Sequence, residues 1–186
     1  MLSHKENSIK ADILTLAKCE LLSESWEPIL CHRLWAEQTA VIIFLRHFAC
    51  AACRAHAVDV WQRREQYQSK GAKIYFVGNG QPSFIEGFKK DLSLEGANIY
   101  TDPSLASFRA AGFKRGFLAA LGPKAIVNYT KLASSGNVTG YKKGAGDIWQ
   151  LGGVLVVHKS GKVGYQYISE IAGDFPPESN VTIDDN

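Results

Sequence analysis

The chain has 186 residues, of which 46% are hydrophobic and 21% are charged, a balance typical of a globular protein with one substantial core. The formal net charge of +3 is too small, and the basic residues are too scattered, to predict a nucleic-acid or membrane-surface partner. The strongly apolar run at residues 41–45 is far shorter than the ~20 residues that span a bilayer. These features predict a single domain over residues 1–186, with no nucleic-acid partner and no membrane span.

The N-terminal segment predicts where the protein resides. Charged residues interrupt its apolar positions, so it lacks the continuous apolar stretch of an export signal. The N-x-T triplets at Asn128, Asn137 and Asn180 are then accidental, because this sequon matters only in a secreted chain. We therefore expect a cytoplasmic protein in a reducing compartment, where structural disulfides are rare.

From the N-terminus onward, predicted helices and strands alternate. Residues 7–18 have the apolar spacing of a helix, residues 19–31 are irregular with one or two short strands, and residues 39–46 form a buried strand. The next elements are a helix over 51–69, a buried strand over 72–80, a helix over 81–96, a short strand over 97–103 and a helix over 104–112. Residues 113–150 are interpreted as an insertion with two helical pieces around Pro123, and residues 152–169 as a closing β-hairpin.

This order of elements predicts an α/β fold. Alternating strands and helices imply a mixed, mainly parallel central sheet with helices on both faces, and the C-terminal β-hairpin adds an antiparallel edge. In such sheets the chemistry is found at the carboxyl ends of the strands. Cys50 lies at such an end, between the strand at 39–46 and the helix that begins at residue 51.

The position of Cys50 predicts a reactive thiol. The N-terminus of a helix carries partial positive charge, which lowers the pKa of a cysteine placed there. Arg46, His47 and Arg54 are potential cationic neighbours that would add to this effect. Cys53 follows one helical turn later and can close a small disulfide ring with Cys50. The pair therefore has a nucleophile, Cys50, and a resolving thiol, Cys53, as dithiol–disulfide exchange requires.

Three blocks of the sequence together resemble a known family. They are "VIIFLRHFACAACRAHA" at residues 41–57, "VGNG" at 77–80 with "DPSLASF" at 102–108, and "GGVLVVHKSGKVGYQYIS" at 152–169. The chain resembles the AhpC/TSA-like, peroxiredoxin-like proteins of the thioredoxin superfamily. The resemblance implies a thioredoxin-like fold and an antioxidant oxidoreductase with Cys50 and Cys53 as its redox pair. It also implies a disulfide or peroxide substrate, a thiol reductant such as the thioredoxin or glutathione system, and no metal or organic cofactor.

The sequence departs from these relatives at positions that bear on activity. Peroxiredoxins have a P-x-x-x-T/S-x-x-C pattern, and Ile43 and His47 occupy its Pro and Thr/Ser positions here. The hydroxyl that helps to bind peroxide is therefore absent, which predicts weak turnover of hydrogen peroxide. Thioredoxins carry a cis-proline facing the cysteine pair, and this chain has Gly152 and Gly153 in that region. These glycines either let a substrate backbone approach closely or form a turn at the strand start.

Two other functions remain open from the residues alone. His47, Cys50, Cys53 and His56 are chemically suitable zinc ligands, although a chelate formed within so short a segment would be cramped. The second alternative is a non-enzymatic thioredoxin-fold binding module, in which residues 113–150 and the glycines at 152–153 form the partner surface. The remaining cysteines, Cys19 and Cys31, have no partner at an informative spacing and are interpreted as inert thiols.

Overall fold

The computed structural model describes residues 10–116, 142–177 and 180–183. Within these ranges the strands form one seven-stranded sheet in the order β2-β1-β5-β4-β3-β6-β7. Its strands are β1 (Glu20–Leu22), β2 (Pro28–Leu30), β3 (Thr39–Phe44), β4 (Ala72–Gly78), β5 (Asn98–Thr101), β6 (Gly153–Val157) and β7 (Val163–Ile168). Of the one or two short strands expected within residues 19–31, two are present, as a short hairpin at one edge of the sheet.

The sheet is mixed, as the sequence predicts. β3, β4 and β5 run parallel to one another, whereas β6 and β7 form an antiparallel hairpin that pairs with β3. β3 and β4 are almost entirely buried because both faces of the sheet are covered, and this explains why their sequences are mostly apolar, with only Lys73 charged. The predicted C-terminal hairpin is confirmed.

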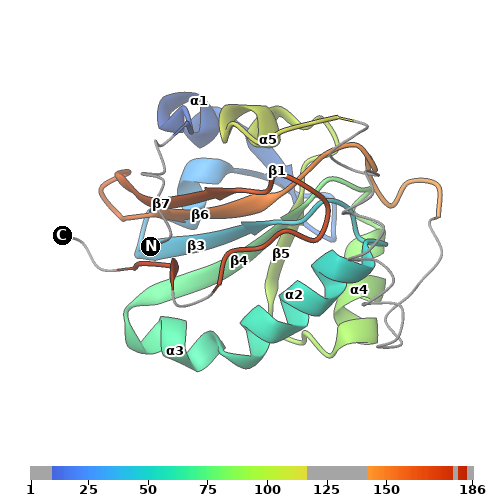
Figure 1. Cartoon of the computed structure of the whole chain (residues 1–186), viewed down its shortest axis with the longest axis horizontal. Helices are drawn as coiled ribbons and strands as arrows, with labels where there is room; N and C mark the ends of the chain where they lie inside the picture. The colour runs from blue at the N-terminus through green and yellow to red at the C-terminus, as the bar shows by residue number, and fades with distance from the viewer. Residues whose placement is uncertain (1–9, 117–141, 178–179, 184–186) are drawn as a thin grey trace, which may run out of the picture.

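Helices cover both faces of the sheet (Figure 1). α1 (Ile13–Lys18) and α5 (Ala106–Ala110) lie on one face, and α2 (Ala51–Gln62), α3 (Arg64–Ser69) and α4 (Phe84–Leu92) lie on the other. A 3-10 helix, η1 (Cys31–Leu34), follows β2. The sheet therefore separates two hydrophobic cores, one beneath α2 to α4 and one beneath α1 and α5.

Several helices differ from their predicted bounds. The single helix expected over 51–69 is two helices, because the Arg63 amide turns to the Val60 carbonyl at 3.2 Å and tightens the chain there. No glycine or proline marks this break, so the sequence gives no signal for it. α1 begins only at Ile13, where the Asp12 side chain caps it by accepting from the Thr15 amide. α4 and α5 are likewise shorter than predicted.

Most of the expected insertion at 113–150, including the helical pieces around Pro123, lies outside the described residues. Its last part, residues 142–150, lies over the carboxyl ends of β3 and β4. There the Phe48 amide donates to the Ala145 carbonyl at 3.0 Å, and the Gln81 amide donates to the Gly144 carbonyl at 2.8 Å. In the described part of the chain, no helix has the length and apolar character that crossing a bilayer requires.

Candidate active site

Cys50 lies at the junction that the sequence predicts. β3 ends at Phe44, and Cys50 is the N-cap residue of α2. Its amide donates to the His47 carbonyl at 3.0 Å, while its sulfur accepts a hydrogen bond from the Cys53 amide at 3.3 Å. The Cys50 sulfur therefore occupies the place of a capping oxygen, where it faces the positive end of the helix and one of its otherwise unpaired N–H groups.

Cys53 lies directly against Cys50. The Cys53 thiol donates to the Cys50 sulfur across 2.8 Å, and the two side chains are both buried as free cysteines. Burial, followed by the contact with Cys50, raises the pKa of Cys53 well above its usual value. Cys53 is thus held as the protonated partner, and Cys50 is the sulfur on which donors converge.

Arg46 connects both sulfurs to the chain that covers them. Its amide donates to the Cys53 sulfur at 3.4 Å, and its Nη1 donates to the Cys50 sulfur at 3.8 Å. The rest of the guanidinium is fixed by the carbonyls of Ile148, 2.6 Å from Nη2, and Gln150, 3.3 Å from Nε. Because Arg46 is buried and held at both ends, its positive charge stays beside Cys50.

The other two expected cationic neighbours differ from the prediction. Burial and the nearby Arg46 charge lower the pKa of His47 to about 3, so His47 is neutral near pH 7 and adds no positive charge. The Arg54 guanidinium forms an ion pair with Asp91 of α4 at 3.2 Å, and it lies 5.7 Å above the Phe88 ring. The structure therefore places the Arg46 charge beside Cys50, leaves His47 without a charge there, and directs Arg54 toward α4.

Asn79 and Asp147 form a link that the sequence analysis missed. The Asp147 amide donates to the Asn79 Oδ1 at 2.9 Å, and the Asn79 Nδ2 reaches the Asp147 carbonyl at 3.5 Å. Gly146, with φ +127°, permits this contact, because a Cβ there would lie 2.0 Å from the Asn79 Oδ1. The link holds residues 146–150, and with them the carbonyls that bind Arg46, over the end of β4. In the sequence, the glycines on either side of Asn79, Gly78 and Gly80, were the feature that could have drawn attention to this residue.

Gly152 and Gly153 are packing residues rather than a substrate surface. A Cβ at Gly152 would lie 1.9 Å from the Phe44 carbonyl oxygen. A Cβ at Gly153 would lie 2.2 Å from the Tyr167 carbonyl oxygen and 2.4 Å from the Phe113 ring. Of the two expectations for these glycines, substrate approach or a turn at the strand start, the close contacts favour the second, because the protein's own backbone fills the space beside them at the start of β6.

The proposed zinc ligands do not assemble. The His56 ring stacks on Phe175 at 4.0 Å between centroids, on the outer side of α2. Among the residues that the structure describes, no three His, Cys, Asp or Glu side chains are placed to hold a metal ion. The zinc hypothesis therefore finds no support in this geometry.

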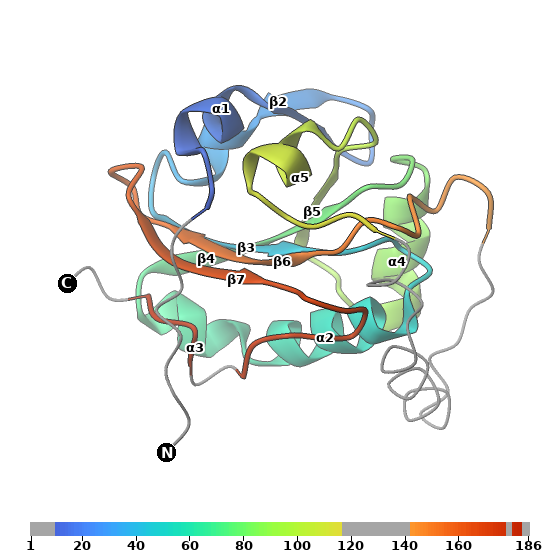
Figure 2. The ribbon, with the colours of Figure 1, turned by 45° about the horizontal axis from the view of Figure 1, so that its top comes forward.

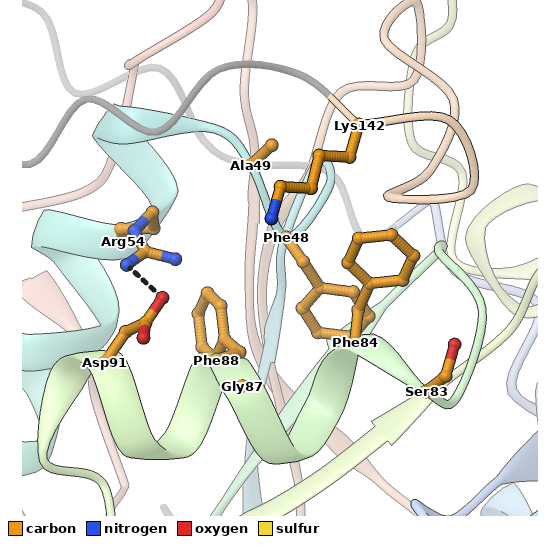
Figure 3. Close-up of a pocket in the computed structure, with 9 residues that line it drawn as sticks. All are labelled: Phe48, Ala49, Arg54, Ser83, Phe84, Gly87, Phe88, Asp91 and Lys142. Atoms are coloured by element: carbon orange, nitrogen blue, oxygen red, sulfur yellow. Dashed lines mark hydrogen bonds and ion pairs between the residues drawn. The ribbon is translucent and has the colours of Figure 1, made fainter.

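A pocket of about 270 Å³ opens between the start of α2 and α4 (Figure 3). Ala49, the residue before Cys50, lies at one side of it, and the aromatic rings of Phe48, Phe84 and Phe88 form its apolar wall. Its polar lining comes from Arg54, Ser83, Asp91 and Lys142, and Gly87 completes it. The pocket thus places an apolar surface with charged margins next to the loop that carries Cys50.

Known proteins are similar to this chain in sequence and in fold. A family model described as AhpC/TSA antioxidant enzyme matches residues 59–170. The chain belongs to this family. It is 32% identical over 157 residues to the prostamide/prostaglandin F synthase of Aquarana catesbeiana, covering 81% of this chain and 76% of the relative. It is also 29% identical over 159 residues to thioredoxin-like protein AAED1, chloroplastic, of Arabidopsis thaliana, covering 80% of this chain and 62% of that protein.

Solved structures agree with the family on the fold. Peroxidoxin BcpB from Mycobacterium tuberculosis superimposes with a TM-score of 0.62 at 15% identity, covering 86% of each chain. Peroxiredoxin Q from Xanthomonas campestris gives a TM-score of 0.59 at 13% identity, covering 83% of this chain and 82% of that one. The thioredoxin-like fold that the resemblance implied is confirmed. The AhpC/TSA match begins at residue 59, after both cysteines. Any assignment of roles to Cys50 and Cys53 therefore has to be argued from the geometry described above.

Proposed function

We propose that this AhpC/TSA protein is a thiol oxidoreductase in which Cys50 is the nucleophile and Cys53 the resolving thiol. The observation that carries the proposal is the convergence of three donors on the Cys50 sulfur: the Cys53 amide, the Cys53 thiol and the Arg46 guanidinium. These donors favour a negative charge on Cys50, and the thiolate is the reactive form of cysteine. Arg46 is the positioning residue, because it contacts both sulfurs and is fixed by backbone carbonyls.

The proposed reaction needs the two cysteines, a peroxide or disulfide substrate, and an external thiol reductant. With a peroxide, the Cys50 thiolate attacks one oxygen, the O–O bond breaks, and an alcohol or water leaves as Cys50 becomes a sulfenic acid. With a disulfide, the attack gives a mixed disulfide and releases one thiol. Cys53 then attacks the Cys50 sulfur, forming the Cys50–Cys53 disulfide and releasing water or the second thiol. An external thiol reductant returns the pair to the dithiol.

We place the substrate's non-reacting part in the pocket between α2 and α4. Its aromatic wall suits an apolar group, and Lys142 at its margin suits a nearby negative charge, since the Arg54 charge is paired with Asp91. The relatives named prostamide/prostaglandin F synthase are consistent with an apolar organic substrate, and this reaction is a candidate for the present chain. The proposed reductant is a thioredoxin or glutathione system in a reducing compartment. We propose the cytoplasm, although the Arabidopsis relative is named as chloroplastic.

Mass spectrometry after stepwise oxidation tests the assignment. Titration with hydrogen peroxide and with a model disulfide should convert Cys50 first and then yield a Cys50–Cys53 link. Cys50→Ser should abolish turnover, and Cys53→Ser should stop it after one mixed disulfide or sulfenic acid. Retention of function by Cys50→Ser would instead favour the non-enzymatic binding module. Oxidation that begins at Cys53 would contradict the proposed order.

A further inference from the structure

Two cysteines that the proposed reaction does not use lie opposite each other at the open end of the β1–β2 hairpin. The hairpin pairs Glu20 with Leu30, so the next pair in this register is Cys19 with Cys31. The Cys31 amide donates to the Cys19 carbonyl at 2.9 Å and so extends the hairpin by one hydrogen bond, whereas the Cys19 amide donates to the Leu16 carbonyl of α1 at 3.0 Å. Residues opposite each other across an antiparallel pair of strands have Cα atoms ~4.5–5.5 Å apart, within the range of ~4.4–6.8 Å that disulfides span.

The two thiols also share one face of the hairpin. Glu20 and Leu30, the neighbouring pair, are exposed, whereas Cys19, at the end of α1, and Cys31, the first residue of η1, are turned inward. Cys19 and Cys31 are accordingly buried, and both belong to the core beneath α1 and α5. Two cysteines that lie opposite each other at one end of a hairpin and enter the same core have the arrangement that a disulfide needs.

We propose that Cys19 and Cys31 form a second dithiol, which a two-electron oxidant closes into a cross-strand disulfide. Two S–H bonds break and one S–S bond forms. The oxidant takes up both protons and both electrons, as a peroxide does on becoming an alcohol and water. This dithiol belongs to the α1 and α5 side of the sheet, whereas Cys50 and Cys53 belong to the α2 side (Figure 2). Its oxidation is therefore separate from the proposed active site.

The surroundings of the two sulfurs set the order of the steps. Cys19 lines an open groove of about 550 Å³ together with Lys18, Asp102 and Ser104, so an oxidant reaches it from solvent. Cys31 lies deeper and acts as the resolving thiol. Burial raises the pKa of both thiols, and it raises that of Cys31 far more strongly. The nearby Asp102 carboxylate adds to the effect, so few thiolates are present near pH 7 and this pair requires more oxidant, or a longer exposure, than Cys50 does.

The test uses the full chain carrying Cys50→Ser and Cys53→Ser, so that Cys19 and Cys31 are the remaining thiols. After oxidation with diamide, a two-electron thiol oxidant, the protein is unfolded and treated with N-ethylmaleimide, and its intact mass is measured. We expect the oxidised monomer to take up no maleimide and the reduced protein to take up two. Peptide mapping should then show a Cys19–Cys31 link, and the additional change Cys31→Ser should abolish it.

Two outcomes would overturn the proposal. One is a folded protein, shown by circular dichroism, whose two thiols still take up maleimide after exhaustive oxidation. The other is a link found only between two chains or only when the oxidation is done in denaturant. The melting temperature provides a second measurement, because a cross-strand link compatible with the native hairpin should raise it by about 6 °C or more, reversibly with dithiothreitol. A lower melting temperature after linking would show that the native register does not hold the pair.

Discussion

Replacing Arg46 with methionine tests the electrostatic basis of the proposed active site. Methionine is similar in length and fills the buried space, but it carries no charge and donates no hydrogen bond. The change removes the Nη1 contact to the Cys50 sulfur and leaves the Ile148 and Gln150 carbonyls without their guanidinium donor. The Arg46 amide still donates to Cys53, so the change isolates the effect of the side chain on Cys50.

The expected size of the effect follows from the distance. Two unit charges 3.8 Å apart, the separation of Nη1 and the Cys50 sulfur, interact by about 4 kcal/mol at an effective dielectric constant of 20. The guanidinium charge is spread over several atoms and is partly offset by two carbonyls, so about 1.5–2 kcal/mol of this should act on the thiolate. That energy corresponds to a ~10–30-fold smaller thiolate fraction in Arg46→Met at a pH where the thiol form predominates.

The assay is the rate at which iodoacetamide alkylates Cys50, expressed as the ratio between about pH 6 and about pH 9. The ratio cancels any change in how easily the reagent enters. Alkylation should reach Cys50 before Cys53, and Arg46→Met should lower the ratio ~10-fold or more. Arg54→Met is the matched control, because Arg54 is also buried but is paired with Asp91. An unchanged ratio in Arg46→Met, or an equal loss in Arg54→Met, would refute the reasoning.

Three further predictions concern other residues. Assayed with one recycling reductant, hydrogen peroxide should be turned over more slowly than a model disulfide, because a missing preorganised donor lowers rates ~10²–10³-fold; rates like those of dedicated peroxidases would show that His47 or Arg46 replaces the hydroxyl. Burial lowers the pKa of His47 to about 3 and of His56 to about 4, so the unfolded chain binds more protons below its ordinary histidine pKa. Stability should therefore fall as pH drops below ~6.5, by about 2 kcal/mol per histidine at ~pH 5, and His47→Gln should flatten the dependence of the urea midpoint on pH. Gly152→Ala should lower the free energy of unfolding by about 2 kcal/mol or more, whereas Gly87→Ala, whose Cβ meets no atom within 4 Å, should raise it by ~0.5–1 kcal/mol; equal effects in urea titrations would contradict the packing argument.

The parts of the structure that the sequence predicted depend on local signals. The apolar run that ends at Leu45, followed by a helix-forming segment from Ala51, is sufficient to place Cys50 between a buried strand and a helix start. The alternation of elements likewise predicts the mixed sheet and the closing hairpin. By contrast, α2 ends at Gln62 because the Arg63 amide bonds the Val60 carbonyl, and no residue type in the sequence predicts this change of acceptor.

The missed features depend on contacts between distant parts of the chain. The carbonyls that hold Arg46 lie more than a hundred positions later, and backbone groups look alike in every sequence. Cys19 and Cys31 gave no recognisable spacing, because their juxtaposition arises from the register of a hairpin whose strands are three residues each. The cationic role expected of His47 failed for a related reason: burial, which decides its charge, is a property of the folded chain.

Near-complete burial of the two sulfurs of the proposed active site makes their accessibility an equilibrium instead of a fixed property. Cys50 is 1% exposed and Cys53 is 0% exposed, so a reagent meets sulfur only while the chain around them is displaced. Every observed rate is then the product of the population of this open form and the chemistry that follows. A series of thiol reagents of increasing width would act as a molecular ruler for the opening. The narrowest reagent that fails to react would mark the upper size limit for anything that touches Cys50.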